Sequence, residues 1–156
     1  MHLPNHFLNK LLGLAICSLA LQASVSHAQD IKAASLPAAR VAADAATTAR
    51  FALGLSRNNG QSFDAAALTT DSVRLIGTIE PEAGQLGKPA QIYVVAQTGG
   101  RYFMRNAGGS FVPWDGNVAS LVPFRSNEVL TAQHPVDFLT GNIPMAGRFN
   151  LFLGYK

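Results

Sequence analysis

The amino-acid sequence predicts an all-β fold, an antiparallel sandwich or barrel that follows a removable N-terminal segment. Three observations lead to this prediction. After residue 50, short runs with alternating large apolar residues recur at spacings of about 8–12 residues. Clusters of Gly, Asn and Asp, which tolerate turn conformations, separate these runs. The same part of the sequence shows no convincing helical period.

The first 28 residues have the order of a secretory signal peptide. Lys10 precedes the apolar run LLGLAICSLALQA at residues 11–23, which is too short to span a bilayer. Small residues at Ser26 and Ala28 predict cleavage between Ala28 and Gln29. The alternative for this segment is a buried core helix.

A second alternative is a lipoprotein modified at Cys17. It is disfavoured because Ile16 stands where a small residue is required and the apolar run continues beyond the cysteine. Cleavage after Ala28 would remove the chain's one cysteine. Residues 29–49 are rich in alanine and are interrupted by Pro37, which predicts a flexible leader before a sandwich domain at residues 50–156.

Strands and turns follow one another through this domain. Strands are predicted over residues 51–55, 72–80, 91–97, 101–105, 111–114, 128–132, 136–139 and 148–155. Turns are predicted at residues 58–60, 99–100, 108–109 and 115–117, and a loop at residues 81–89. The strand at 91–97 is apolar on both faces, as expected of a central strand. The last strand alternates most regularly, with Phe149, Leu151, Leu153 and Tyr155 on one face.

Four stretches between residues 71 and 155 carry a recognisable pattern. They are GTIEPEAGQLGKPAQIYVVAQ, RYFMRNAGGSFVPWDGN, LVPF and AGRFNLFLGY. The pattern resembles a secreted β-sandwich module that occurs in or beside large exported surface proteins and hydrolases of Gram-negative bacteria. The resemblance implies an immunoglobulin-like sandwich of about seven or eight strands and a non-enzymatic accessory or interaction role, with no catalytic residues.

Composition argues against several classes of function. Only 13% of the residues are charged, and the formal net charge is +3. The basic residues are scattered along the chain, whereas nucleic-acid binders carry a dense basic patch. We therefore expect neither a nucleic-acid partner nor binding to an anionic membrane, and no integral membrane segment in the mature chain.

Few residues suit catalysis. After cleavage one histidine remains, His134, and the following proline predicts an extended loop position at the surface. Glu80 and Glu82 flank Pro81 in a loop, where solvated carboxylates are the default. A small secreted hydrolase that uses these groups is a disfavoured alternative.

Metal and cofactor sites are not predicted. Transition metals require several His or Cys ligands, and calcium requires clustered oxygen ligands. Residues 115–117 (Asp-Gly-Asn) are the nearest calcium candidate, but Asp-Gly-Asn is a common turn sequence.

Aromatic residues interleaved with arginines form the most suggestive cluster. Strand alternation groups Tyr102 with Met104 on one face and Phe103 with Arg105 on the other. One face is expected to belong to the core and the other to be partly exposed, and Trp114 is expected to fill the end of the sandwich. The candidate binding residues are Tyr102, Phe103, Arg105, Trp114, Asp115 and Phe124.

The sequence thus favours an exported, non-enzymatic binding or structural module, in the periplasm or at the cell surface of a Gram-negative bacterium. Its expected partner is another secreted or surface protein. The alternatives are a carbohydrate-binding module that uses exposed aromatic side chains and the small hydrolase. An edge strand could add to a partner's sheet. The sequence does not reveal which strands form the edges.

Overall fold

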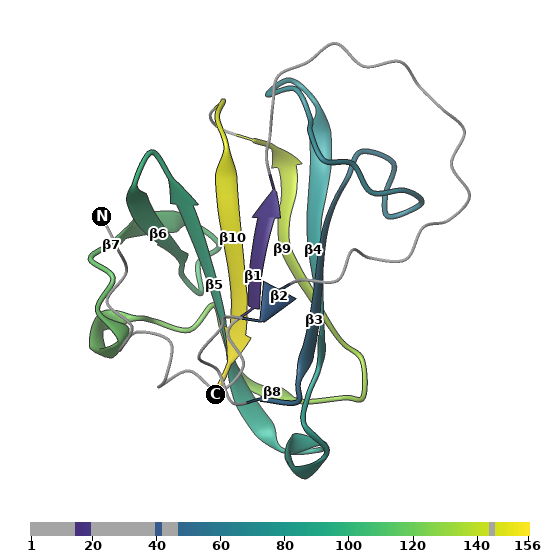
Figure 1. The fold of residues 1–156 in the computed structure, drawn as a ribbon, viewed down its shortest axis with the longest axis vertical. Coiled ribbons are helices and arrows are strands. Elements are labelled where there is room, and N and C mark those ends of the chain that lie inside the picture. The colour runs from purple at the N-terminus through teal and green to yellow at the C-terminus, as the bar shows by residue number, and fades with distance from the viewer. Residues whose placement is uncertain (1–14, 20–39, 42–46, 144–145) are drawn as a thin grey trace.

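The computed structural model of the chain describes residues 15–19, 40–41, 47–143 and 146–156. Two antiparallel β-sheets face each other, which confirms the predicted all-β sandwich (Figure 1). The predicted cleavage site after Ala28 and most of the alanine-rich leader lie outside the described residues.

The larger sheet has the strand order β2-β1-β10-β5-β6-β7, and β8 pairs with β5 beside this path. Its strands are β1 (Ala15–Leu19), β2 (Arg40–Val41), β5 (Pro89–Thr98), β6 (Arg101–Arg105), β7 (Phe111–Trp114), β8 (Arg125–Val129) and β10 (Phe149–Tyr155). The smaller sheet has the order β3-β4-β9, with β3 (Arg50–Ser56), β4 (Ser72–Glu80) and β9 (His134–Asn142). Short 3-10 helices lie at Ala83–Gln85 and Val118–Ser120.

Most predicted elements are confirmed. β4, β6 and β7 have the predicted bounds, and in β4 buried residues alternate with exposed or partly buried ones. β5 is a central strand, paired with β10 on one side and with β6 and β8 on the other. Gly99 and Gly100 link β5 to β6 with φ angles of 54° and 74°. Two positive φ angles in a two-residue loop favour glycine and match the twist of a hairpin.

Two expectations are wrong. β8 ends at Val129, so the strand predicted over residues 128–132 is displaced. Its pairing with β5 is irregular, and Asn127 has a φ of 59°, so a regular side-chain alternation does not mark where this strand lies. His134 is the first residue of β9 and is only 6% exposed, so it does not lie in a surface loop. Pro135 is tolerated there because β9 is an edge strand.

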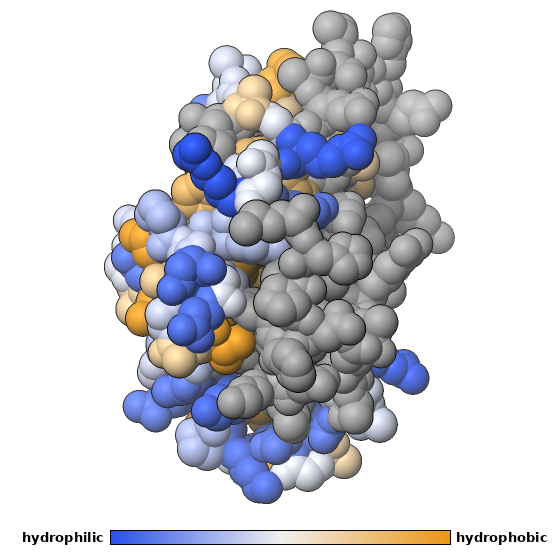
Figure 2. Space-filling model, turned by 60° about the vertical axis from the view of Figure 1, so that its left-hand side comes forward, coloured by the Kyte–Doolittle hydropathy of each residue, from blue (hydrophilic) through white to orange (hydrophobic). Residues whose placement is uncertain are grey.

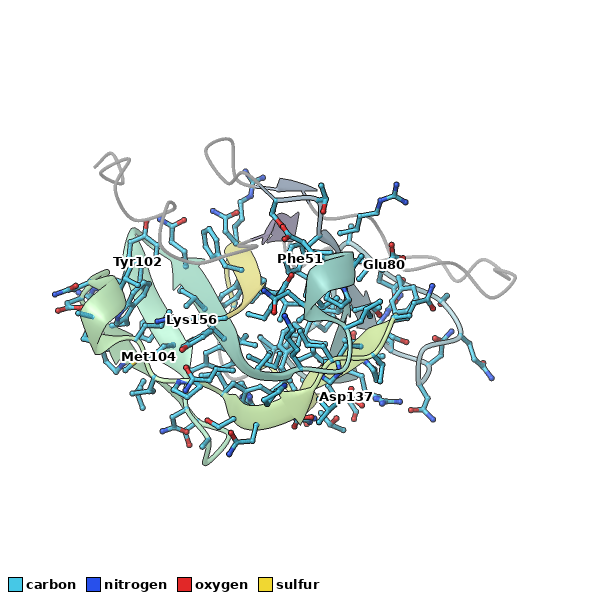
Figure 3. All side chains as sticks on the ribbon, turned by 90° about the horizontal axis from the view of Figure 1, so that it is seen from below. Phe51, Glu80, Tyr102, Met104, Asp137 and Lys156 are labelled. Carbon is cyan, nitrogen blue, oxygen red and sulfur yellow. The ribbon has the colours of Figure 1, made fainter. Side chains whose placement is uncertain are left out.

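The main core lies between the two sheets. Phe51, Leu53 and Leu55 of the smaller sheet meet Leu151 and Leu153 of the larger one, and each of these side chains is buried. Figure 3 shows the core side chains filling the space between the sheets, and it labels Phe51 among them.

At Gly77 of β4 a core leucine of the larger sheet lies against the backbone of the smaller sheet. A Cβ atom at Gly77 would lie 2.7 Å from Leu153 Cδ2 and 3.1 Å from Leu53 Cδ2. Both leucines are almost fully buried, so neither can move aside at low cost. The absence of a side chain at Gly77 therefore sets how deeply Leu153 enters the core.

The substitution Gly77→Ala should destabilise the domain by about 1–3 kcal/mol, because overpacking forces the two leucines out of place. Urea denaturation followed by Trp114 fluorescence measures this change. Gly84→Ala is the matched control, because a Cβ atom there would meet no atom within 4 Å. Equal midpoints for the two variants would contradict the packing described here.

Candidate functional site

Trp114 belongs to a second hydrophobic cluster, on the face of the larger sheet that points away from the smaller one. We call it the outer cluster; its buried members are Tyr93, Val95, Trp114 and Phe152. Tyr102 and Met104, labelled in Figure 3, pack against it from β6. The Tyr102 and Trp114 rings meet edge to face with centroids 5.9 Å apart. Trp114 is thus buried, as expected, but it does not lie between the sheets.

The turn after Trp114 holds this residue in place. The Trp114 Nε1–H donates to the Asn117 carbonyl and to Ser120 Oγ, each at 3.1 Å. Asp115 Oδ1 accepts from the Ser120 hydroxyl at 2.7 Å and from the Asn117 amide at 2.9 Å. These bonds, above all that from Ser120, lower the pKa of Asp115. Asp115 therefore acts here as a turn-forming residue.

Arg105 stacks on aromatic rings on the opposite face of the same strands. Its guanidinium carbon lies 5.1 Å from the Phe111 ring centroid and 5.4 Å from that of Phe124. Arg125 lies on the Phe124 ring as well, at 5.2 Å. Burial lowers the pKa of Arg105, and its Nε atom has no hydrogen-bond partner among the described residues. Cation–π contacts with Phe111 and Phe124 therefore stabilise the charge of this side chain.

The six candidate binding residues do not form one surface. Tyr102 and Trp114 pack in the outer cluster, whereas Arg105 and Phe124 lie on the side of the main core. Phe103 pairs with Ala96 and Pro113 and is half-buried, and Asp115 is exposed. Figure 2 shows hydrophobic and hydrophilic side chains interspersed over the coloured part of the face that carries β6 and β7.

Of the candidate catalytic side chains, Glu80 is the last residue of β4, His134 is buried, and Glu82 forms hydrogen bonds within the domain. His134 Nε2 lies 3.8 Å from Glu128 Oε2, and both ring nitrogens are buried without a hydrogen-bond partner among the described residues. Glu82 Oε1 accepts hydrogen bonds from the Thr47 hydroxyl at 2.6 Å and from the Thr48 amide at 3.2 Å. This carboxylate therefore attaches the segment before β3 to the domain.

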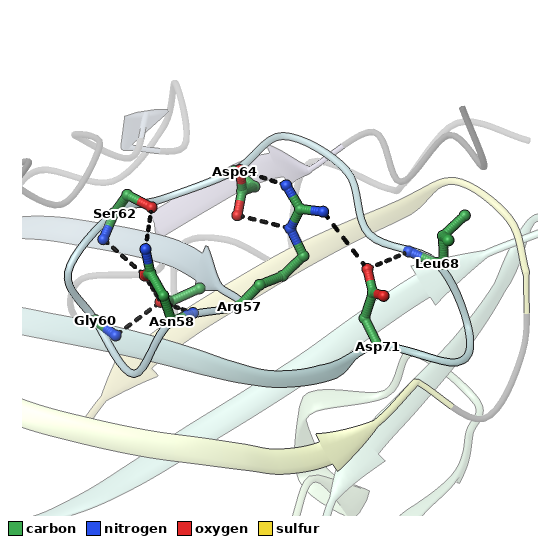
Figure 4. Close-up of polar contacts among 8 residues, drawn as sticks. Arg57, Asn58, Gly60, Ser62, Asp64, Leu68 and Asp71 are labelled. Atoms are coloured by element: carbon green, nitrogen blue, oxygen red, sulfur yellow. Dashed lines mark hydrogen bonds and ion pairs between the residues drawn. The ribbon is translucent and has the colours of Figure 1, made fainter. Parts of the chain in front are cut away.

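A polar network organises the loop between β3 and β4 (Figure 4). Arg57 donates to both carboxylate oxygens of Asp64, at 3.1 and 3.2 Å, and lies 3.8 Å from Asp71 Oδ2. The hydrogen bond to Asp64 is the main reason why the pKa of Arg57 is raised. Asn58 and Ser62 link two points of the same loop through two further hydrogen bonds. This loop therefore has a defined shape at the end of the smaller sheet.

Several described edge strands carry features that oppose pairing with another chain. β7 contains Pro113 and has four residues. β8 has a left-handed residue, Asn127, and β9 contains Pro135. The end of β3 is bridged by its own loop, where Asp64 pairs with Leu55. Short strands, proline and irregular backbone are the usual protection of sheet edges.

β10 lacks such protection. Its sequence, FNLFLGY, has neither proline nor charge and runs for seven residues. One side of β10 pairs with β5, and the other side pairs with β1 at Ala15–Leu19. This covering strand lies within the predicted signal peptide. The β10 edge is the functional candidate that sequence reasoning missed, because strand order is set by long-range pairing.

The remaining observations do not assign the chain to a family. Among the residues that the structure describes, no helix has the length and apolar character needed to cross a membrane. The described residues include no group of three or more His, Cys, Asp or Glu side chains that could hold a metal ion. Comparison with family models, curated proteins and solved structures found no match for the chain.

The substitution Ser120→Ala should raise the pKa of Asp115 towards its ordinary value, because the hydroxyl is the largest cause of the lowered pKa. An NMR titration of the Asp115 carboxyl carbon measures this shift. Ser126→Ala, at an exposed position of β8, is the control and should leave the pKa of Asp115 unchanged. An unchanged Asp115 pKa in the Ser120 variant would show that this turn is not formed in solution.

Alkaline pH should destabilise the domain through Tyr155. Burial raises the pKa of Tyr155 above its ordinary value, and it raises the pKa values of Tyr93 and Tyr102 as well. A raised folded-state pKa contributes stability that is present below the unfolded-state value and is lost as the pH rises through the folded-state value.

Urea midpoints for the wild type and Tyr155→Phe, measured from about pH 8 to about pH 11, test this expectation. The variant should lose less stability over this range, because phenylalanine keeps the ring but has no hydroxyl proton. Identical pH profiles would contradict a burial effect at Tyr155.

Proposed function

We propose that the chain is an exported, non-enzymatic binding or structural module that interacts with another secreted or cell-surface protein. The supporting observation is that Ala15–Leu19 covers the outer edge of β10. These residues lie in the predicted signal peptide, so cleavage after Ala28 would remove them. Export would then free a long apolar edge, which is a known kind of binding site for another polypeptide. The resemblance to secreted sandwich modules of Gram-negative bacteria supports the same function and a location in the periplasm or at the cell surface.

The alternatives have weaker support. A carbohydrate-binding module needs accessible aromatic rings, but Trp114 is 6% exposed and Tyr102 packs against it. A hydrolase that uses His134 needs access to that ring, which is also 6% exposed. Burial of these side chains favours the protein-binding proposal over both.

Export should yield a chain that begins at Gln29. Mass spectrometry of the protein recovered from the periplasm or the medium identifies this N-terminus. Ala28→Arg should block cleavage, because the processing site requires a small residue, whereas the matched variant Ala33→Arg should be processed normally. A product that begins at Cys17, or a chain that stays uncleaved in the cytoplasm, would contradict the export proposal.

Chemical crosslinking in the native cell, followed by purification of the mature chain, should capture one reproducible exported protein. A glycan titration monitored by Trp114 fluorescence distinguishes the carbohydrate alternative, and we expect no saturable change. Recovery of the mature chain alone, or saturable glycan binding without a protein partner, would overturn the proposed function.

A further inference from the structure

We infer that the mature chain binds an extended strand of its partner along β10, in the place that Ala15–Leu19 occupies here. This inference rests on the proposed export and cleavage. It goes further because it names the binding edge, the direction of the bound strand and the chemistry of the segment that fits.

The place of β1 defines the binding geometry. β1 is antiparallel to β10, and its register runs from Ala15 opposite Leu153 to Leu19 opposite Phe149. Figure 1 shows β1 (purple) beside β10 (yellow), and β1 also lies close to β3 of the smaller sheet. The bound strand would therefore pair with β10 through main-chain hydrogen bonds and lie close to β3.

The side chains of β10 set the chemistry of the partner segment. Leu151 and Leu153 belong to the main core and Phe149 packs against it, so this face of the strand is apolar. Asn150 is already engaged, because its side-chain amide donates to Gln97 Oε1 at 3.0 Å. A matching segment has about five residues in extended conformation, is small or apolar on the side of the core, and lacks proline where it faces β10. The sequence of β1, AICSL, consists of small and apolar residues and contains no proline.

The chain's own leader fits this place less well. β2 (Arg40–Val41) runs antiparallel to β1 and therefore parallel to β10. To replace β1 in the same register, the leader would have to reverse its direction. Its sequence also contains Pro37, which has no N–H to donate.

A second copy of the chain also fits less well. The place beside β10 is filled here by two narrow strands, β1 and β2, that both lie close to β3. The β10 strand of a second copy would arrive with β5 paired to it, as a rigid sandwich edge. A free extended segment of another exported protein can pair with β10 without bringing a second sheet with it.

A peptide-binding experiment tests the inference directly. The probe is a labelled synthetic peptide of residues 12–22 that carries Cys17→Ser to prevent oxidation. The control peptide carries Ile16→Pro and Cys17→Pro. Neighbouring residues of a strand point their N–H groups to opposite sides, so one of the two prolines must remove a hydrogen bond to β10.

The exported mature chain should bind the probe in a saturable manner and at least about tenfold more tightly than the control peptide. The uncleaved Ala28→Arg chain should bind the probe weakly, because its own Ala15–Leu19 holds the edge. Hydrogen exchange of the β10 amides should slow when the mature chain binds the probe, and should change little in β7.

Other outcomes overturn the inference. These are absence of saturable binding, equal binding of the two peptides, and equal binding by the mature and uncleaved chains. A mature dimer with protected β10 amides would identify a second copy as the occupant, and a monomer with protected amides would identify the leader. A mature chain that captures a partner but not the probe overturns this inference alone. One that binds the probe but captures no partner overturns the proposed function alone.

Discussion

The packing of Leu153 against Gly77 is the contact on which the sandwich depends. Leu153 belongs to the larger sheet and Gly77 to the smaller, and a Cβ atom at Gly77 would approach the leucine to 2.7 Å. This close contact limits how near the two sheets can approach each other at this position. Leu153 links the two layers, because it pairs with Val94 of β5 while its side chain reaches the smaller sheet.

Local chemistry explains why much of this fold could be predicted. β4 alternates between more and less buried residues, and Gly99 and Gly100 form the turn between β5 and β6. These features depend on neighbouring residues, which the sequence displays directly. The burial of Trp114 was expected for a similar reason, since a lone tryptophan in a small β domain has a large apolar surface to bury.

Features that depend on distant parts of the chain could not be predicted. His134 precedes a proline, which is compatible with a loop or an edge strand, and only its pairing opposite Ile79 decides between them. Trp114 joins the outer cluster because Phe152 arrives from the far end of the chain. The protected edges and the apolar edge of β10 follow from strand order, which alternation does not encode. The candidate site was missed for this reason.

The two roles of β10 are physically connected. Natural edge strands are commonly protected by a charged or proline residue. β10 has little room for one, because Leu151 and Leu153 fill the main core while Phe152 fills the outer cluster on the opposite face. A charge on either face would be buried, and a proline would threaten the pairing with β5. The remaining protection is a segment that covers the edge, as β1 does here. The same demands that make β10 central to stability therefore make its edge dependent on a covering segment, whichever chain supplies it.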